Sequence, residues 1–186
     1  MAKIGIFYGS TSGITEEIAT TLHEKLGEEV CDIYSMEEDY DEYSQLLDYD
    51  YLLLGCSTWG AGEVQNDWRE PLFDMDIEKP DFTGKTIALF GAADQVSHGK
   101  HFAGALQIMC DHFEKLGATV VGDFPIEGYS FEHSSAVRNG KFVGLPIDEI
   151  NQSDLTEDRI TQWLKALGPI FLGCLLYTSD AADDSL

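Results

Sequence analysis

Near the start of the chain lies the small, hydroxyl-rich sequence Gly9-Ser10-Thr11-Ser12-Gly13-Ile14-Thr15. It follows the apolar run from Ile4 to Tyr8 and precedes a helical pattern, so the order is strand, tight loop and helix start. Backbone N–H groups at a helix N-terminus, together with short hydroxyls, form a natural phosphate site. A triphosphate loop needs a lysine before its final hydroxyl, and here Ile14 stands in that place. The loop therefore favours a phosphate monoester, with an ordinary Ser/Thr-rich turn as the alternative.

Strand and helix patterns alternate along most of the chain, which predicts an α/β fold with a parallel sheet. The predicted strands cover residues 4–8, 29–34, 51–56 and 86–90, with a fifth from 118. The predicted helices cover residues 13–26, a short segment ending near Leu47, a segment opening near Glu63, residues 99–116, and a last segment capped by Ser153 or Thr156 and ended by Gly168-Pro169. Residues 123–146 lack helical periodicity, so we expect an insertion that splits strand five, which resumes at 142–145.

Three loops rich in small, hydroxyl and aromatic residues follow strands one, three and four. The carboxyl ends of parallel strands share one edge of the sheet, where α/β proteins bind their ligands. Trp59 in the second loop offers a large flat face, and His98 in the third loop is placed to lie against the other side of a ring. A phosphate site beside two such side chains predicts a mononucleotide with a conjugated base.

Composition restricts the class of protein. The 186 residues, 44% of them hydrophobic, are sufficient for one domain with a real core. The 34 acidic residues against 11 Lys and Arg give a net charge of −23, which disfavours nucleic acid and anionic membranes and favours basic protein surfaces. Solubility alone is the other explanation of this charge. No run is as long as a membrane span and the chain starts with a strand pattern, so we expect a cytoplasmic protein without membrane insertion.

The four cysteines are far apart and form no Cys-x-x-Cys pair, which predicts reduced thiols and no metal site. They are Cys31, Cys56, Cys110 and Cys174.

Several motifs, in their order and spacing, closely resemble the flavodoxins. The matching segments are residues 6–13, 55–63, 90–95 and 145–156, within a resemblance that spans about residues 2 to 172 and whose insertion is similar to the long-chain type. The resemblance implies a flavodoxin-like three-layer α/β/α sandwich with a five-stranded parallel sheet of order 2-1-3-4-5. It also implies a low-potential, one-electron carrier with non-covalent FMN, which acts in place of ferredoxin and is not an enzyme.

The resemblance also implies which residues contact FMN. The phosphate would be held by Ser10, Thr11, Ser12, Gly13, Ile14 and Thr15; the flavin ring would be lined by Ser57, Thr58, Trp59, Gly60, Ala61 and Gly62; and its pyrimidine edge would contact Ala92, Ala93 and Asp94. His98 stands where the family usually has a stacked tyrosine, and His101 follows close to the ring. For both histidines, a solvated loop side chain is the alternative.

The flavodoxin resemblance further implies how the protein would work. Gly60 would let its peptide turn over on the first reduction and favour a neutral semiquinone, because glycine reaches positive φ at little cost. The expected partners of the monomer are basic surfaces of redox proteins such as ferredoxin–NADP reductase, photosystem I or nitrogenase reductase. The candidate acidic residues for docking are Glu63, Asp67 and Glu70.

Two other functions share this fold class. A phosphorelay receiver needs acids after strands one and three, where this chain has Gly9-Ser10 and Ser57-Thr58. An FMN-dependent NAD(P)H:quinone-type oxidoreductase is the serious alternative, although no second nucleotide motif is visible. We expect one domain over 1–172, and a tail over 173–186 that resembles adapter read-through or is a genuine acidic extension.

Overall fold

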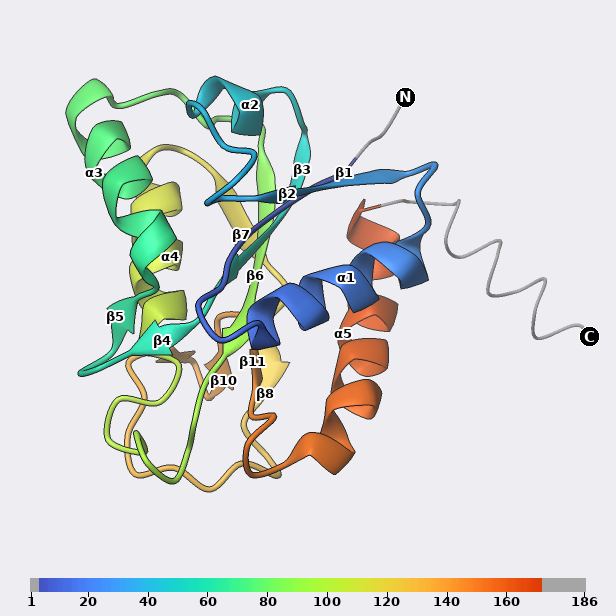
Figure 1. The fold of residues 1–186 in the computed structure, drawn as a ribbon, viewed down its shortest axis with the longest axis vertical. Coiled ribbons are helices and arrows are strands. Elements are labelled where there is room, and N and C mark those ends of the chain that lie inside the picture. Colours follow the sequence, from blue (N-terminus) through green and yellow to red (C-terminus); the bar gives the residue numbers. More distant parts are fainter. Residues whose placement is uncertain (1–3, 172–186) are drawn as a thin grey trace, which may run out of the picture.

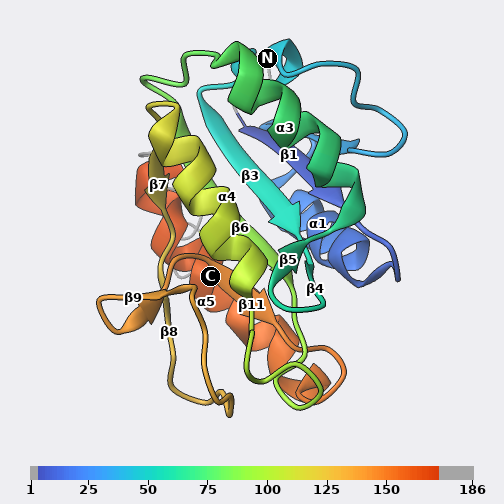
Figure 2. The ribbon, with the colours of Figure 1, turned by 90° about the vertical axis from the view of Figure 1, so that its left-hand side faces the viewer.

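The computed structural model describes residues 4–171, so the predicted tail over 173–186 lies outside the described residues. A central sheet lies between two layers of helices, with α1 (Ile14–Leu26) and α5 (Thr156–Phe171) on one face and α3 (Arg69–Glu78) and α4 (Gly104–Lys115) on the other (Figures 1 and 2). The short α2 (Ser44–Leu47) lies in the connection before β3 (Tyr51–Cys56). The predicted three-layer α/β/α architecture is confirmed.

The main sheet is parallel throughout and has the predicted order 2-1-3-4-5. β2 (Cys31–Ser35) pairs with β1 (Ile4–Gly9), β1 with β3, and β3 with β6 (Thr86–Ala92). Almost every residue of β1, β3 and β6 is buried, because helices cover both faces of these strands.

Strand five is split, as predicted, and both halves pair with the outer edge of β6. β7 (Thr119–Val121) pairs with the start of β6, and β11 (Leu145–Ile147) pairs with its end. The chain between them forms a small antiparallel sheet of β8 (Phe124–Pro125), β10 (Lys141–Phe142) and β9 (Val137–Arg138). The predicted resumption of strand five at 142 is wrong, because β10 belongs to this inserted sheet and pairing with β6 begins only at Leu145.

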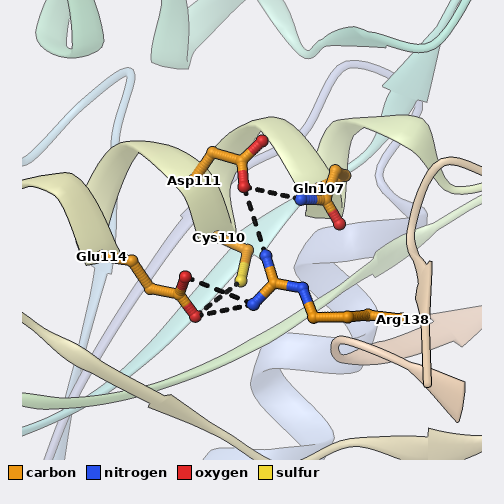
Figure 3. Close-up of polar contacts among 5 residues, drawn as sticks. All are labelled: Gln107, Cys110, Asp111, Glu114 and Arg138. Carbon is orange, nitrogen blue, oxygen red and sulfur yellow. Dashed lines mark hydrogen bonds and ion pairs between the residues drawn. The ribbon is translucent and has the colours of Figure 1, made fainter.

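The insertion is attached to α4 through one arginine. Arg138 of β9 donates to both carboxylate oxygens of Glu114, at 2.9 and 3.2 Å, and to Asp111 at 3.2 Å (Figure 3). Cys110 lies beside this cluster, where burial raises the pKa of its thiol to about 12. The thiol is therefore protonated and unreactive at neutral pH.

Two predicted helix starts are wrong, because local sequence does not reveal the contacts that form there. Glu63 does not open a helix: β5 (Glu63–Val64) pairs antiparallel with β4 (Thr58–Trp59), and a 3-10 turn, η1 (Asn66–Trp68), leads into α3. Helix α4 starts at Gly104 rather than Gly99, because the preceding residues fold into turns that start at Asp94.

The last helix continues past its predicted stop. After η2 (Ser153–Leu155), α5 runs through Gly168-Pro169 to Phe171. Pro169 removes one backbone donor, but Phe171 is 97% buried and its ring lies 5.4 Å from the ring of Tyr51. Burial of an aromatic side chain contributes about 1.5–3 kcal/mol, which offsets much of the roughly 3 kcal/mol that a proline costs inside a helix.

Two fully buried tryptophans fix the core on opposite sides of the sheet. The indole N–H of Trp68, at the start of the α3 layer, donates to the Gly55 carbonyl at 2.8 Å. The indole N–H of Trp163, on α5, donates to the Gly122 carbonyl at 2.8 Å. Trp68 therefore fixes the end of β3, just before the loop at Ser57. Within residues 4–171, no helix is long and apolar enough to cross a membrane.

Candidate functional site

The three loops singled out in the sequence leave the same edge of the sheet. β1, β3 and β6 are parallel neighbours, with Gly9 paired to Cys56 and Gly55 paired to Phe90. The loops that follow them lie together beside the N-termini of α1 and α4 (Figures 1 and 2). The predicted convergence of these loops is confirmed.

Two glycines allow the backbones to approach at this edge. A Cβ at Gly91 would lie 1.9 Å from the Cys56 carbonyl oxygen, and a Cβ at Gly9 would lie 2.1 Å from Oε1 of Gln65. Neither position has room for a side chain. At Gly91 the backbones of β3 and β6 therefore approach closely, and at Gly9 the side chains of Gln65 and Trp68 pack against the end of β1.

The first loop leads into α1 without a capping side chain. Gly13, at the N-cap, has φ of +92° and no side-chain hydrogen bond caps the helix. The N–H groups of the first turn have no intrahelical acceptor, and Thr11 and Ser12 are exposed beside them. The loop carries no basic residue, so it is a neutral site rich in hydrogen-bond donors.

Five hydroxyls of the predicted site share one hydrogen-bonding arrangement. Each accepts a hydrogen bond from an N–H group, which can only donate, and this leaves the hydroxyl proton free to donate elsewhere. None of the five donates to another group within residues 4–171. An anion needs donors, so the three hydroxyls of the first loop, those of Ser10, Thr11 and Thr15, suit a phosphate without a cation in that loop. The pairs are Ser10 with Gly13 N at 3.1 Å, Thr11 with Gln65 Nε2 at 3.1 Å, Thr15 with Ala92 N at 3.3 Å, Ser57 with Trp59 Nε1 at 2.9 Å, and Thr58 with Ala105 N at 3.2 Å.

Two of these hydroxyls also tie the loops together. Thr15 is 99% buried and links α1 to the end of β6. Thr58 accepts from the first turn of α4, a helix whose own N-cap residue provides no side-chain cap. Their contact with a ligand stays a prediction, as does that of Ile14.

The second loop is a hairpin with Trp59 at the end of its first strand. The indole is 44% exposed, and its bond to Ser57 fixes one edge of the ring. Gly60 and Gly62 have φ of +52° and +91°, values that favour glycine, and Ala61 is exposed between them. A Cβ at Gly104 would lie 2.9 Å from the Gly62 Cα, so this hairpin packs directly on the start of α4.

The third loop is organised by Asp94. Its Oδ1 accepts from Val96 N at 3.0 Å, Ser97 N at 2.9 Å and Asn151 Nδ2 at 2.9 Å. Partial burial raises the pKa of Asp94, but these hydrogen bonds outweigh that effect and hold the pKa below its ordinary value. Asp94 is therefore ionised at neutral pH. Ala92 and Ala93 precede it, with Ala93 N bonded to the Ile147 carbonyl at 2.9 Å.

The two histidines of this loop are exposed at the same edge. His98 N donates to the Asp94 carbonyl at 3.1 Å, and His101 N donates to the His98 carbonyl at 3.1 Å. Both backbones are ordered by these turns, while the rings face solvent. Stacking of His98 on a ligand and a position of His101 near it stay predictions.

An open cavity of about 240 Å³ joins the first loop to the hairpin. Its wall is formed by Thr11, Trp59, Val64, Asn66 and Arg69. Val64, Asn66 and Arg69 were not predicted as site residues, because the segment that starts near Glu63 has the pattern of a plain helix. The guanidinium of Arg69 lies 3.2 Å from Glu63, so the cavity wall carries one cation although the phosphate loop carries none.

The described cysteines Cys31, Cys56 and Cys110 are free, buried thiols. Within residues 4–171, no group of three or more His, Cys, Asp or Glu side chains is placed to hold a metal ion.

A doubly wound parallel sheet with a donor-lined cradle at its carboxyl edge defines a mononucleotide-binding α/β protein. Residues 6–163 match the family model described as Flavodoxin, and the chain belongs to the flavodoxin family. The resemblance drawn from the motifs is confirmed.

Individual relatives agree with this assignment. The chain is 59% identical over 172 residues to "Flavodoxin 1" of Azotobacter vinelandii, covering 92% of this chain and 99% of that protein. It is 46% identical to a flavodoxin of Synechococcus elongatus, covering 90% of this chain and 96% of the relative. Among solved structures, it is similar to a Fusobacterium nucleatum flavodoxin bound to flavin mononucleotide, with a TM-score of 0.84, 32% identity, and coverage of 92% and 99%.

Proposed function

We propose that this chain binds FMN without a covalent bond and carries electrons one at a time between redox enzymes. The observation that carries the proposal is the set of five hydroxyls that all accept from N–H groups and keep their protons for a ligand. The similar Fusobacterium nucleatum structure holds flavin mononucleotide, and the donor set of this chain fits the phosphate of such a ligand.

The residues of the first loop would hold the phosphate. The hydroxyls of Ser10, Thr11 and Ser12 and the N–H groups at the start of α1 would donate hydrogen bonds to it, and a charge-assisted hydrogen bond is about twice as strong as a neutral one. The exposed face of Trp59 would cover the flavin ring, with Asp94 and the exposed His98 on the neighbouring loop. When bound, FMN would supply the one-electron chemistry.

The acidic residues set the expected electrochemistry. Glu63, Asp67 and Asp94 lie in or next to the site loops, and Asp94 stays ionised through its hydrogen bonds. One uncompensated charge at ~10 Å with an effective dielectric of ~20 costs about 1.7 kcal/mol. That cost corresponds to about 70 mV at about 2.3 kcal/mol per 100 mV. Several such charges would disfavour addition of electrons and give a low potential, and Arg69 would partly oppose them.

The same charge supports the proposed partners. A net charge of −23 favours docking onto basic surfaces, such as those proposed for ferredoxin–NADP reductase, photosystem I or nitrogenase reductase. In these roles the protein would replace ferredoxin in the cytoplasm when iron is scarce. The candidate docking acids are Glu63 in the hairpin, Asp67 in η1 and Glu70 at the start of α3.

Reduction of cytochrome c by NADPH and ferredoxin–NADP reductase tests this function. We expect reduction to require the FMN-loaded chain and to slow steeply as salt rises from about 50 mM to about 500 mM, because screening weakens charge steering. Oxidation of NADPH by the chain alone would instead identify a flavin oxidoreductase. An FMN-loaded chain that carries no electrons in either assay contradicts the proposal.

A further inference from the structure

Gln65 is a buried polar residue between the hairpin and η1 that no motif singled out. Its side chain is 99% buried, although it lies at the edge of the site. Oε1 accepts from Asp67 N at 3.0 Å, and Nε2 donates to Asp67 Oδ2 at 2.8 Å and to Thr11 Oγ1 at 3.1 Å. One amide therefore joins the segment after Trp59 to the predicted phosphate loop.

The two bonds to Asp67 fix which way round this amide lies. A backbone N–H can only donate and an ionised carboxylate can only accept. The oxygen of the Gln65 amide must therefore face Asp67 N, and its nitrogen must face both the carboxylate and Thr11. If the amide were rotated by 180°, its NH2 group would face the Asp67 N–H, so two donors would meet. Its oxygen would face the Asp67 carboxylate, so two acceptors would meet.

This fixed orientation determines what the Thr11 hydroxyl can do. Because Gln65 Nε2 donates to it, Thr11 Oγ1 accepts there and its proton is left for another acceptor. Thr11 is exposed and lines the open cavity beside Trp59. The hydroxyl proton is thus available on the side where a ligand would lie.

Gln65 also lies against the start of the loop. A Cβ at Gly9 would lie 2.1 Å from Gln65 Oε1 and 2.9 Å from Trp68 Cδ1. The amide therefore contacts the backbone where β1 ends and bonds to the loop two residues later. The Gln65 amide is itself shielded from water, while Thr11 stays exposed.

We propose that Gln65, held by Asp67, is a positioning residue that orients the Thr11 hydroxyl as a donor to the phosphate of the bound ligand. This inference rests on the proposed FMN site. It predicts that Gln65 strengthens the contribution of the phosphate to the binding free energy and leaves the contribution of the flavin ring unchanged.

Riboflavin, which lacks the phosphate, provides the test. We expect Gln65→Met to weaken FMN binding about 5- to 30-fold, which is equivalent to about 1–2 kcal/mol, and to change riboflavin binding less than about twofold. Thr11→Val should give a similar FMN-specific loss, and the double variant little further loss, because both remove the same interaction. Gln107→Met is the matched control, since Gln107 also bonds to an aspartate, at 2.6 Å, but on α4. Both of its affinities should stay unchanged.

Two more conservative substitutions provide the test if the Gln65→Met variant does not fold. Asp67→Asn removes the charged acceptor that fixes the amide, and should lower the FMN-to-riboflavin affinity ratio several-fold. Thr11→Ser keeps the hydroxyl and should keep the ratio. Affinities are measured by quenching of flavin fluorescence.

The outcomes separate this inference from the proposed function. Wild-type protein that binds FMN, combined with equal losses of FMN and riboflavin in the Gln65 or Asp67 variants, overturns the positioning role alone. Fully additive effects of Gln65→Met and Thr11→Val overturn it as well. Wild-type protein that binds neither flavin overturns the proposed site and the inference together.

Discussion

Substitution of Gly91 by alanine tests how tightly the strand ends are packed. A Cβ there would lie 1.9 Å from the Cys56 carbonyl oxygen and 2.7 Å from its carbon, while ordinary contact begins at 3.4 Å. Both atoms belong to the backbone and Cys56 is fully buried, so no side chain can rotate away. The clash can be relieved only if β3 and β6 separate at their carboxyl ends.

The expected cost has two contributions. Overpacking costs about 1–3 kcal/mol and one or two lost sheet hydrogen bonds add about 1 kcal/mol each. We therefore predict a total loss of about 2–5 kcal/mol in unfolding free energy, from those two contributions.

The assay is urea unfolding of the apoprotein together with an FMN titration. Separation of β3 and β6 would move the hairpin away from the loop at Asp94, so FMN affinity should also fall at least about tenfold, or about 1.4 kcal/mol. Gly27→Ala is the matched control, because Gly27 has φ of +97° and a Cβ added there would meet nothing within 4 Å. It should cost about 1–3 kcal/mol, because alanine strains the backbone at this positive φ, and leave FMN affinity unchanged. Gly91→Ala with the stability of this control and wild-type affinity would refute the reasoning.

Three further predictions concern the core and the surface. Trp68→Phe should lower the unfolding free energy by about 1–3 kcal/mol, because it leaves the buried Gly55 carbonyl without its donor; equal stability in urea would contradict this. Burial lowers the pKa of His112 even though its ring pairs with the carboxylate of Asp76. The unfolded chain therefore binds a proton at this histidine at a higher pH than the folded chain does, and the unfolding free energy should fall as the pH drops below about 6.5. His112→Gln should lose less stability than wild type between pH 7 and pH 5, and parallel profiles would count against it. Arg138→Ala should cost no more than about 1 kcal/mol, because its ion pairs are exposed to solvent, and a larger loss would show that the cluster of Figure 3 is a core element.

The alternation of strands and helices was predictable because its signals are local. Buried strands such as Tyr51–Cys56 read as apolar runs, and α1 reads as a stripe at helical spacing. The starts of α3 and α4 were not predictable, because tertiary contacts set them: Thr58 caps α4 from another loop, and β5 pairs back onto β4. The end of α5 was missed because packing of Phe171 outweighs the local signal of Pro169.

The residues of the candidate site were likewise predictable only in part. Ser10 and Trp59 were predicted as site residues because clusters of glycines and hydroxyl residues after the strands can be seen in the sequence alone. Gln65 and Arg69 were missed because both act together with Thr11, which precedes them by more than fifty residues in the sequence. Gln65 donates to Thr11, and Arg69 lines the same cavity as Thr11. The orientation of the hydroxyls was likewise invisible, since it follows from which donor each oxygen meets in three dimensions.

A titration of the purified apoprotein with FMN tests whether the loops at the carboxyl edge of the sheet bind a flavin phosphate. A neutral cradle of hydroxyls and backbone N–H groups should bind one FMN per chain, quench its fluorescence, and prefer FMN to riboflavin by at least about tenfold, which corresponds to about 1.4 kcal/mol from the phosphate. Flavin fluorescence that stays unquenched at every ratio, or equal affinity for FMN and riboflavin, would contradict the account.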